Sequence, residues 1–194
     1  MEDYCICTIP LGVLQQRKIA FVPDLPEHRW KAIDSIGMGL LDKIVLTFGQ
    51  SFWGDYQQFG IADAADPTLV KSFYDCSREV GGDAVLMVFL GGNSARRLSA
   101  MAEQEEVQDT MAALRKVFDN VPDLVASKVT RWMQDPWACG SYSFAKVGST
   151  AEVYDTVAGP IGNLLFAGEH TSKHAHSTVH GAWETGQREA KRLC

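Results

Sequence analysis

The C-terminal part of the chain carries the pattern that most restricts its fold. Residues 163–167 form a short apolar run typical of a buried strand, and Gly168 permits a tight exit from that strand. A helix is then expected from Thr178 to the end of the chain, with small apolar residues at helical spacing: Val179, Ala182, Gly186, Ala190 and Leu193. This order brings the carboxylate of Glu169 and a helix N-terminus to one place. Because a helix N-terminus offers backbone N–H groups and a positive dipole end, that place favours an anion or a ring that becomes negative when reduced.

The rest of the chain alternates strands and helices without an internal repeat, which indicates an α/β fold with a mixed sheet. Hydrophobic periodicity predicts a helix from Pro26 to about Ile36, and strands over residues 43–48, 71–75, 84–90 and 128–133. Residues 99–118 are expected to form an amphipathic helix, because their apolar side chains recur at helical spacing. The acidic residues expected on its solvent face are Glu103, Glu105, Glu106 and Asp109.

Composition and charge limit the classes of protein to which the chain can belong. Of its 194 residues, 46% are hydrophobic, which is enough for a sizeable core in one large domain or two small lobes. No apolar run approaches the roughly 18 residues that cross a bilayer, and residues 1–4 do not begin a secretion signal, so no membrane association is expected. The five scattered cysteines fit reduced thiols in an intracellular protein, either nuclear or cytoplasmic. The net charge of −6 argues against direct nucleic-acid binding and is compatible with a cationic substrate, although most intracellular domains are mildly acidic.

Five further segments follow one another in a characteristic order: residues 4–14, 21–26, 37–46, 51–53 and 131–143. Together with the C-terminal segment they resemble the FAD-dependent amine oxidases, the family of monoamine oxidases, polyamine oxidases and lysine-specific histone demethylases. The Asp-Pro-Trp of residues 135–137 and the Gly-Ser-Tyr-Ser of residues 140–143 are most similar to the demethylases and polyamine oxidases.

The resemblance implies a substrate-binding lobe and a C-terminal remnant of a Rossmann-like FAD-binding lobe. Residues 1–14 would be a strand segment of the flavin lobe, residues 15–127 the substrate-binding lobe, and residues 128–194 the C-terminal flavin-binding segment. Members of the family cradle the FAD pyrophosphate on a G-x-G-x-x-G turn between a strand and a helix. No such run occurs in this sequence, so we expect the chain to be part of a larger enzyme whose N-terminal FAD-binding half is its missing partner.

Lys43 is the residue that the resemblance assigns to catalysis. In the family, a lysine at this place in a Gly-x-Gly-x-x-x-Lys strand holds a water against flavin N5. Its ammonium group would stabilise developing negative charge and assist reoxidation. Taken alone, the same residue is also typical of a solvent-facing lysine on an edge strand.

Trp132, Trp137 and Tyr142 match positions at which the family walls the flavin ring and presents an aromatic face to the amine. A buried aromatic cluster is the structural alternative for these three residues. The chain departs from the family at residues 174–177, His-Ala-His-Ser, where relatives often carry an aromatic residue that forms one wall of the cage.

Glu169, Thr178 and Val179 match the flavin-contacting positions. The resemblance implies that Glu169 reaches the ribityl and pyrophosphate region and that the backbone of Thr178 and Val179 faces the pyrimidine edge of the flavin. A helix or loop cap is the alternative role for Glu169. Monoamine oxidases attach their flavin through a cysteine, but Cys139 is not an evident equivalent, so noncovalent FAD is expected.

Several histidines near Glu169 raise the alternative of a zinc site. They are His170, His174, His176 and His180. The i, i+4 spacing of His176 and His180 would suit zinc if both lay on one helix. Since Thr178 begins the helix, His176 would lie outside it, and no metal is expected.

The resemblance implies oxidation of an amine, either a polyamine or N-methyl-lysine, by hydride transfer to FAD, with an imine and hydrogen peroxide as products. The alternative is a catalytically silent amine-oxidase-like fragment or interaction module that lacks bound FAD. For the isolated chain we expect weak or absent FAD binding. We also expect self-association through apolar strand edges such as Ile6 and Leu165.

Overall fold

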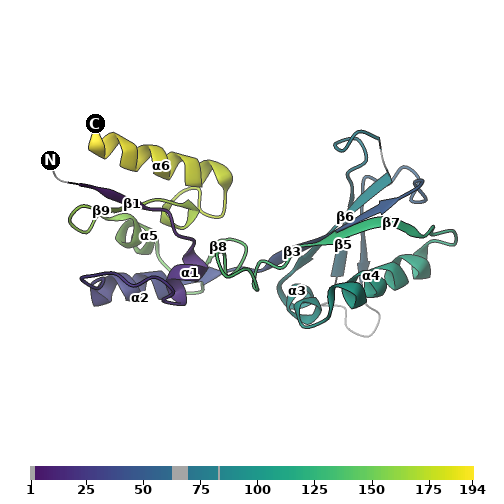
Figure 1. The fold of residues 1–194 in the computed structure, drawn as a ribbon, viewed down its shortest axis with the longest axis horizontal. Helices are drawn as coiled ribbons and strands as arrows, with labels where there is room; N and C mark the ends of the chain where they lie inside the picture. The colour runs from purple at the N-terminus through teal and green to yellow at the C-terminus, as the bar shows by residue number, and fades with distance from the viewer. Residues whose placement is uncertain (1–2, 63–69, 83) are drawn as a thin grey trace. The chain divides into compact units, whose positions relative to one another are not determined.

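The computed structural model describes residues 3–62, 70–82 and 84–194, which form two compact units (Figure 1). The terminal unit combines the two ends of the chain, Met1–Gly39 and Met133–Cys194, and the central unit is Leu40–Trp132. The resemblance places residues 15–39 in the substrate-binding lobe, whereas in the structure they belong to the terminal unit. Their helix α2 (Glu27–Ser35) packs there against α5 (Ala151–Ala158).

Two small sheets and several helices build the terminal unit. Its elements in chain order are β1 (Cys5–Cys7), α1 (Leu11–Gln15), α2, β2 (Ile36–Met38), β8 (Ser143–Ala145), α5, β9 (Leu164–Phe166), the short helix η1 (Glu169–Thr171) and α6 (Val179–Leu193). Strands β1 and β9 are parallel, and β2 and β8 are antiparallel. The buried guanidinium of Arg29 on α2 donates to the backbone oxygens of Val157 and Gly159 at the end of α5. This contact joins the N-terminal and C-terminal parts of the chain into one core.

A five-stranded antiparallel sheet forms the central unit, with the strand order β4-β5-β6-β3-β7. Its elements are β3 (Leu41–Phe48), β4 (Gln58–Ala62), β5 (Val70–Asp75), β6 (Ala84–Gly91), α3 (Gly92–Ser99), α4 (Glu103–Val117) and β7 (Leu124–Val129). Along β3, alternate residues from Asp42 to Phe48 are buried, while Lys43 and Val45 on the other face are half-buried. Helices α3 and α4 run along one face of the sheet (Figure 1). The helix-covered face holds the apolar core, and Lys43 lies on the opposite face because side chains alternate along a strand.

Two expected elements differ from the structure. The helix expected over residues 99–118 begins later, as α4, because Ala102 caps its start: the backbone N–H of Ala102 donates to the side chain of Glu105 at 3.0 Å. Helix α3, which was not expected, precedes it and ends at Ser99. The strand expected over residues 128–133 lies earlier, at Leu124–Val129, where it pairs with β3. Residues 128–132 therefore belong to the central unit and not to the C-terminal segment.

Helix α6 buries a different face from the one its apolar residues suggest. Its buried residues are Gly181, Thr185 and Glu189, whereas Val179 is 89% exposed and Leu193 is also exposed. The small apolar residues at helical spacing are therefore on a helix, as expected, but they do not form its buried face. The hydroxyl of Thr185 accepts a hydrogen bond from the backbone N–H of Gly168. This polar contact orients α6 about its axis so that the face of Thr185 is the buried one.

Leu165, expected at an exposed edge, is buried, and Ile6 is half-buried where β1 pairs with β9. Within the described parts of the chain, no helix is both long enough and apolar enough to span a bilayer.

Candidate active site

The turn after β9 is built around Gly168. This glycine has a φ of +132°, and a Cβ atom placed on it would lie 2.7 Å from Cε1 of His170. Its backbone N–H donates to Oγ1 of Thr185 at 2.9 Å, and Oγ1 of Thr171 donates back to its carbonyl oxygen at 2.8 Å. Only glycine fits such a turn without strain, which fixes the direction in which the next residue, Glu169, leaves the strand.

The carboxylate of Glu169 joins two segments that are distant in sequence. Its Oε1 atom accepts from the backbone N–H of Ser143 at 2.9 Å, and Oε2 accepts from the hydroxyl of Ser143 and from the backbone N–H of Ser177, each at 2.6 Å. An ionised carboxylate only accepts hydrogen bonds, so these three donors match its charged form. In this structure Glu169 holds the start of β8 against the loop that leads into α6.

The start of α6 is held by Thr178. Its Oγ1 atom accepts from the backbone N–H of Gly181 at 3.0 Å and donates to the carbonyl oxygen of Ala175 at 2.6 Å. A Cβ atom on Gly181 would lie 1.9 Å from that same oxygen, so the helix start approaches the preceding loop too closely for any side chain there. The first N–H groups of a helix have no acceptor within it. Gly181 donates to Thr178, so the N–H groups of the exposed residues Val179 and His180 are the ones that could meet an anionic or electron-rich ligand.

Trp137 and Tyr142 flank the bend that precedes β8. The backbone N–H of Trp137 donates to Oδ1 of Asp135 at 2.8 Å, and the carbonyl oxygen of Tyr142 accepts from the backbone N–H of Gly39 at 2.7 Å. Trp137 is 78% exposed and Tyr142 is exposed, so neither is part of a buried aromatic cluster. These two residues, Glu169, Thr178 and Val179 all lie in the terminal unit. Within that unit, the bond between Ser143 and Glu169 connects the segment of Tyr142 to the loop before Thr178.

Lys43 and Trp132 lie in the central unit. Lys43 on β3 stands opposite Phe89 on β6, and its Nζ atom is 5.6 Å from the centre of that ring, within reach of a cation–π interaction. Tyr74 packs edge-on against Phe89 at a centroid distance of 4.8 Å. Lys43 therefore stands on a sheet face with aromatic neighbours. Trp132 is 37% exposed, and its backbone N–H donates to Oδ1 of Asp42 at 2.9 Å.

Sequence reasoning missed a buried acidic group in the central unit. Glu106, expected on the solvent face, is 2% exposed, and its carboxylate lies 3.0 Å from the guanidinium of Arg131. Burial raises the pKa of Glu106 to about 7, with Arg131 acting in the opposite direction and Asp42 adding to the rise. On α4, Glu106 lies one helical turn before Thr110 and two before Leu114, and its spacing from Leu114, which the sequence places on the apolar face, is the signal that could have indicated a buried position.

The histidines of the C-terminal segment have separate environments. His170 is buried, and desolvation lowers its pKa to about 4, so it is neutral at physiological pH. The ring of His176 stacks on Tyr154 at 4.8 Å, and His180 is exposed on α6. Among residues 3–62, 70–82 and 84–194, no set of three or more His, Cys, Asp or Glu side chains is arranged to hold a metal ion.

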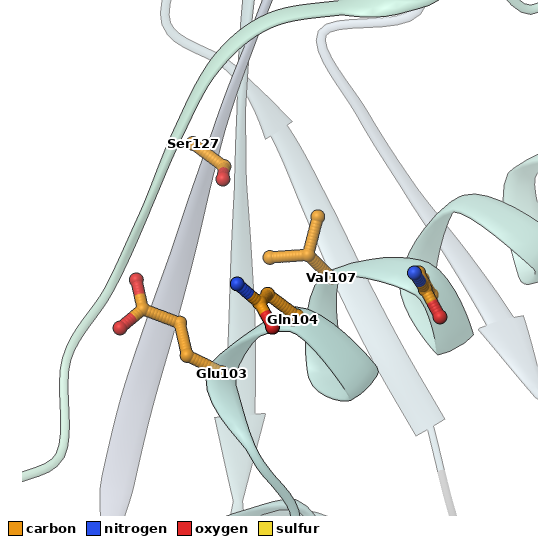
Figure 2. A pocket seen from close by; sticks show the side chains of 5 residues that line it. Glu103, Gln104, Val107 and Ser127 are labelled. Carbon is orange, nitrogen blue, oxygen red and sulfur yellow. The ribbon is translucent and has the colours of Figure 1, made fainter.

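Two grooves lie apart from the candidate site residues. One of about 590 Å³ runs between the start of α4 and β7 (Figure 2), and its lining residues are Glu103, Gln104, Val107, Gln108 and Ser127. The other, of about 440 Å³, is in the terminal unit beside β1 and β9. Neither groove is lined by Lys43, Trp137 or Glu169.

Comparison with known proteins shows similarity along the whole chain. The profile of the family described as flavin containing amine oxidoreductase matches residues 2–194. Lysine-specific histone demethylase 1 homolog 3 of Arabidopsis thaliana is 39% identical over 199 residues, which cover 100% of this chain and 12% of that protein. Lysine-specific histone demethylase 2 of Homo sapiens is 38% identical over 197 residues, covering 97% of this chain and 24% of that protein. The chain thus spans a quarter or less of these two relatives.

Solved structures agree with the sequence matches. Cyclohexylamine oxidase from Brevibacterium oxydans superposes with a TM-score of 0.79 at 25% identity, covering 98% of this chain and 42% of that one. A variant of putrescine oxidase superposes with a TM-score of 0.81 at 19% identity over 98% of this chain and 42% of that one, which shows a shared fold.

Proposed function

The chain belongs to the family of flavin-containing amine oxidoreductases, and on that premise we propose that the protein carrying it oxidises an amine with noncovalently bound FAD. Relatives that are 34% to 39% identical include several named lysine-specific histone demethylases. Their names favour an N-methyl-lysine side chain over a polyamine as the substrate. The missing N-terminal half of the FAD site would come from another part of the protein.

The hydrogen bonds made by Glu169 are the observation that carries the proposal. One carboxylate holds the segment of Tyr142 and the loop before Thr178 in a fixed arrangement, with bonds of 2.6 to 2.9 Å. The same loop ends at the exposed start of α6, where the N–H groups of Val179 and His180 suit the pyrimidine edge of a flavin. The residues present therefore fit the flavin end of FAD. The sequence holds no G-x-G-x-x-G run for the pyrophosphate end.

Bound FAD would supply the acceptor for a hydride from the carbon beside the amine nitrogen. The exposed faces of Trp137 and Tyr142 would orient the substrate through cation–π and apolar contacts. The ammonium of Lys43 would stabilise negative charge that develops near the reduced ring. Glu169 would act through position, since its oxygens already accept from Ser143 and Ser177.

The second candidate function is a silent, FAD-free module that binds another protein. The apolar side chains exposed on α6 support it: Val179, Trp183 and Leu193. The same exposure is expected if the absent half of the flavin lobe covers this helix in the full-length protein. Flavin content separates the two functions, because only the enzyme needs a cofactor.

The full-length protein, purified without a tag, provides the test. We expect a bound-flavin absorbance spectrum and release of hydrogen peroxide from a dimethyl-lysine peptide, with slower release from spermine. Oxidation of spermine alone would reassign the substrate to a polyamine. A colourless full-length protein that oxidises neither compound would refute amine oxidation and support the silent module.

A further inference from the structure

The aspartate that precedes Lys43 is buried, and only one of its two carboxylate oxygens has hydrogen-bond partners among the described residues. Asp42 is 4% exposed and lies on the face of β3 that carries Ile44 and Leu46. Its Oδ2 atom has no hydrogen-bond partner among the described residues. Burying a carboxylate with an unsatisfied oxygen is unfavourable. Packing alone therefore does not explain an aspartate at this position.

The other oxygen of Asp42 holds the chain that leaves the sheet. Strand β7 ends at Val129, yet Oδ1 of Asp42 accepts from the hydroxyl of Thr130 at 3.1 Å and from the backbone N–H of Trp132 at 2.9 Å. The hydroxyl of Thr130 in turn accepts from the backbone N–H of Lys43 at 2.8 Å. The backbone N–H of Thr130 donates to the carbonyl oxygen of Lys43 at 2.9 Å. One buried carboxylate thus connects the backbone positions of Lys43 and Trp132 beyond the end of the strand pairing.

The residue between Thr130 and Trp132 has a separate anchor. Arg131 donates to the carbonyl oxygen of Met101 at 3.0 Å and lies 3.0 Å from the carboxylate of Glu106 on α4. Loss of the Asp42 carboxylate would therefore free the backbone of Trp132 while Arg131 still held the segment to the helices. The structural effect of a substitution at Asp42 is therefore expected to stay close to Trp132 and Lys43.

We propose that Asp42 is a positioning residue that sets the place of Trp132 directly and the place of Lys43 through Thr130. The inference rests on the proposed function, in which Lys43 assists reoxidation of the flavin. Asp42 acts through the backbone, because alternation along β3 directs its side chain to the face opposite that of Lys43. The role needs an acceptor oxygen at the Oδ1 position and does not need a negative charge.

Four variants of the full-length, flavin-loaded protein test this role. Asp42→Ala removes the acceptor and Asp42→Asn retains one, while Thr130→Val removes the bridging hydroxyl and Thr130→Ser retains it. The measurements are flavin content, kcat, KM, the rate of flavin reoxidation by oxygen, and amide hydrogen exchange at Lys43 and Trp132.

We expect Asp42→Ala and Thr130→Val to keep flavin but to slow reoxidation and kcat by about tenfold, as small displacements of a catalytic group do, with little change in KM. Exchange at Trp132 should accelerate in Asp42→Ala, and exchange at Lys43 in Thr130→Val. Asp42→Asn and Thr130→Ser should stay within about twofold of the parent, because they preserve the geometry. A purely structural role would instead lower flavin content and thermal stability without a selective effect on reoxidation.

Parent-like reoxidation and exchange in both Asp42→Ala and Thr130→Val would overturn the proposal. If Asp42→Ala does not fold, the Thr130 pair decides the outcome by the same measurements. If the parent protein oxidises no amine, the proposed function fails. Hydrogen exchange then still decides whether Asp42 and Thr130 position Lys43 and Trp132.

Discussion

Glu169 accepts two hydrogen bonds from Ser143, one from its backbone N–H at 2.9 Å and one from its hydroxyl at 2.6 Å. Ser143 is fully buried at the start of β8 and Glu169 is half-buried, so this pair is partly shielded from water. Because charge-assisted hydrogen bonds are stronger than neutral ones, Glu169 is a principal link between the segment of Trp137 and Tyr142 and the loop that leads into α6.

Replacing Glu169 with Gln should weaken that link. The NH₂ half of the glutamine amide cannot accept a hydrogen bond. At least one N–H or O–H group that now donates to the carboxylate would therefore face another donor. We expect the free energy of unfolding to fall by about 1.5 to 3 kcal/mol, the range for a hydrogen bond to a charged group, and flavin retention to fall with it. Denaturant titration measures the first effect and flavin absorbance after gel filtration the second. Glu184→Gln, at an exposed position of α6, is the matched control, and an equal effect of the two changes would contradict the assignment.

Lys43→Met should separate catalysis from cofactor binding. Methionine keeps the bulk of the side chain but removes the charge, so FAD should stay bound in the full-length protein while turnover falls by about tenfold or more. Steady-state peroxide release measures the change. Lys128→Met is the control, because Lys128 is exposed on β7 opposite Val45, on the same face of the sheet as Lys43. Unchanged turnover in Lys43→Met would remove this lysine from the mechanism.

The stability of the protein should depend on pH through Glu106. Burial raises its pKa from 4.5 to about 7, so between these values the folded protein retains a proton that the unfolded chain releases. The free energy of unfolding should therefore fall as pH rises through this window, by about 2 to 3 kcal/mol in all. Denaturant midpoints at pH 5, 6, 7 and 8 provide the measurement. Glu106→Gln should remove most of this slope, and an unaltered slope would assign the pH dependence to other groups.

Two glycines of α6 should respond in opposite ways to alanine. A Cβ atom at Gly181 would lie 1.9 Å from the carbonyl oxygen of Ala175, whereas one at Gly186 meets nothing within 4 Å. Gly181→Ala should lower the free energy of unfolding by about 1 to 3 kcal/mol or more through overpacking. Gly186→Ala should raise it by about 0.5 to 1 kcal/mol through helix propensity. Thermal and denaturant unfolding of the chain test both, and a stabilising Gly181→Ala would show that the close approach is not maintained.

The isolated chain should purify without colour. FAD in this family is also held at its pyrophosphate, and each lost hydrogen bond to a charged phosphate is worth about 1.5 to 3 kcal/mol, so affinity should weaken by orders of magnitude. The exposed side chains of Val179, Trp183 and Leu193 should favour self-association. Absorbance spectra and light scattering during gel filtration check both expectations. A yellow monomer with near-stoichiometric flavin would show that FAD binding does not depend on a pyrophosphate site outside this chain.

Several features of the site could be predicted from the sequence because they depend on neighbours within a few residues. The turn at Gly168 and the helix start at Thr178 follow from backbone conformation and local capping, and both are present in the structure. The strand expected over residues 43–48 is likewise present, within β3, where Lys43 lies on the face opposite its buried neighbours. The ordered motifs predicted the family and the mixed α/β fold, which the comparisons confirm.

The features that sequence reasoning missed depend on contacts between distant segments. Helix α6 buries Thr185 and not its apolar stripe, because the partner of Thr185 is the backbone of Gly168 on another element. Glu106 is buried with Arg131 as its partner, and Arg131 belongs to the segment that follows β7. Asp42 and Trp132 are 90 residues apart in the sequence, and only the pairing of β3 with β7 brings them within 2.9 Å. Local composition determined which elements form, and tertiary pairing decided which polar groups they bury, because a buried charge or hydroxyl requires a partner that only the fold supplies.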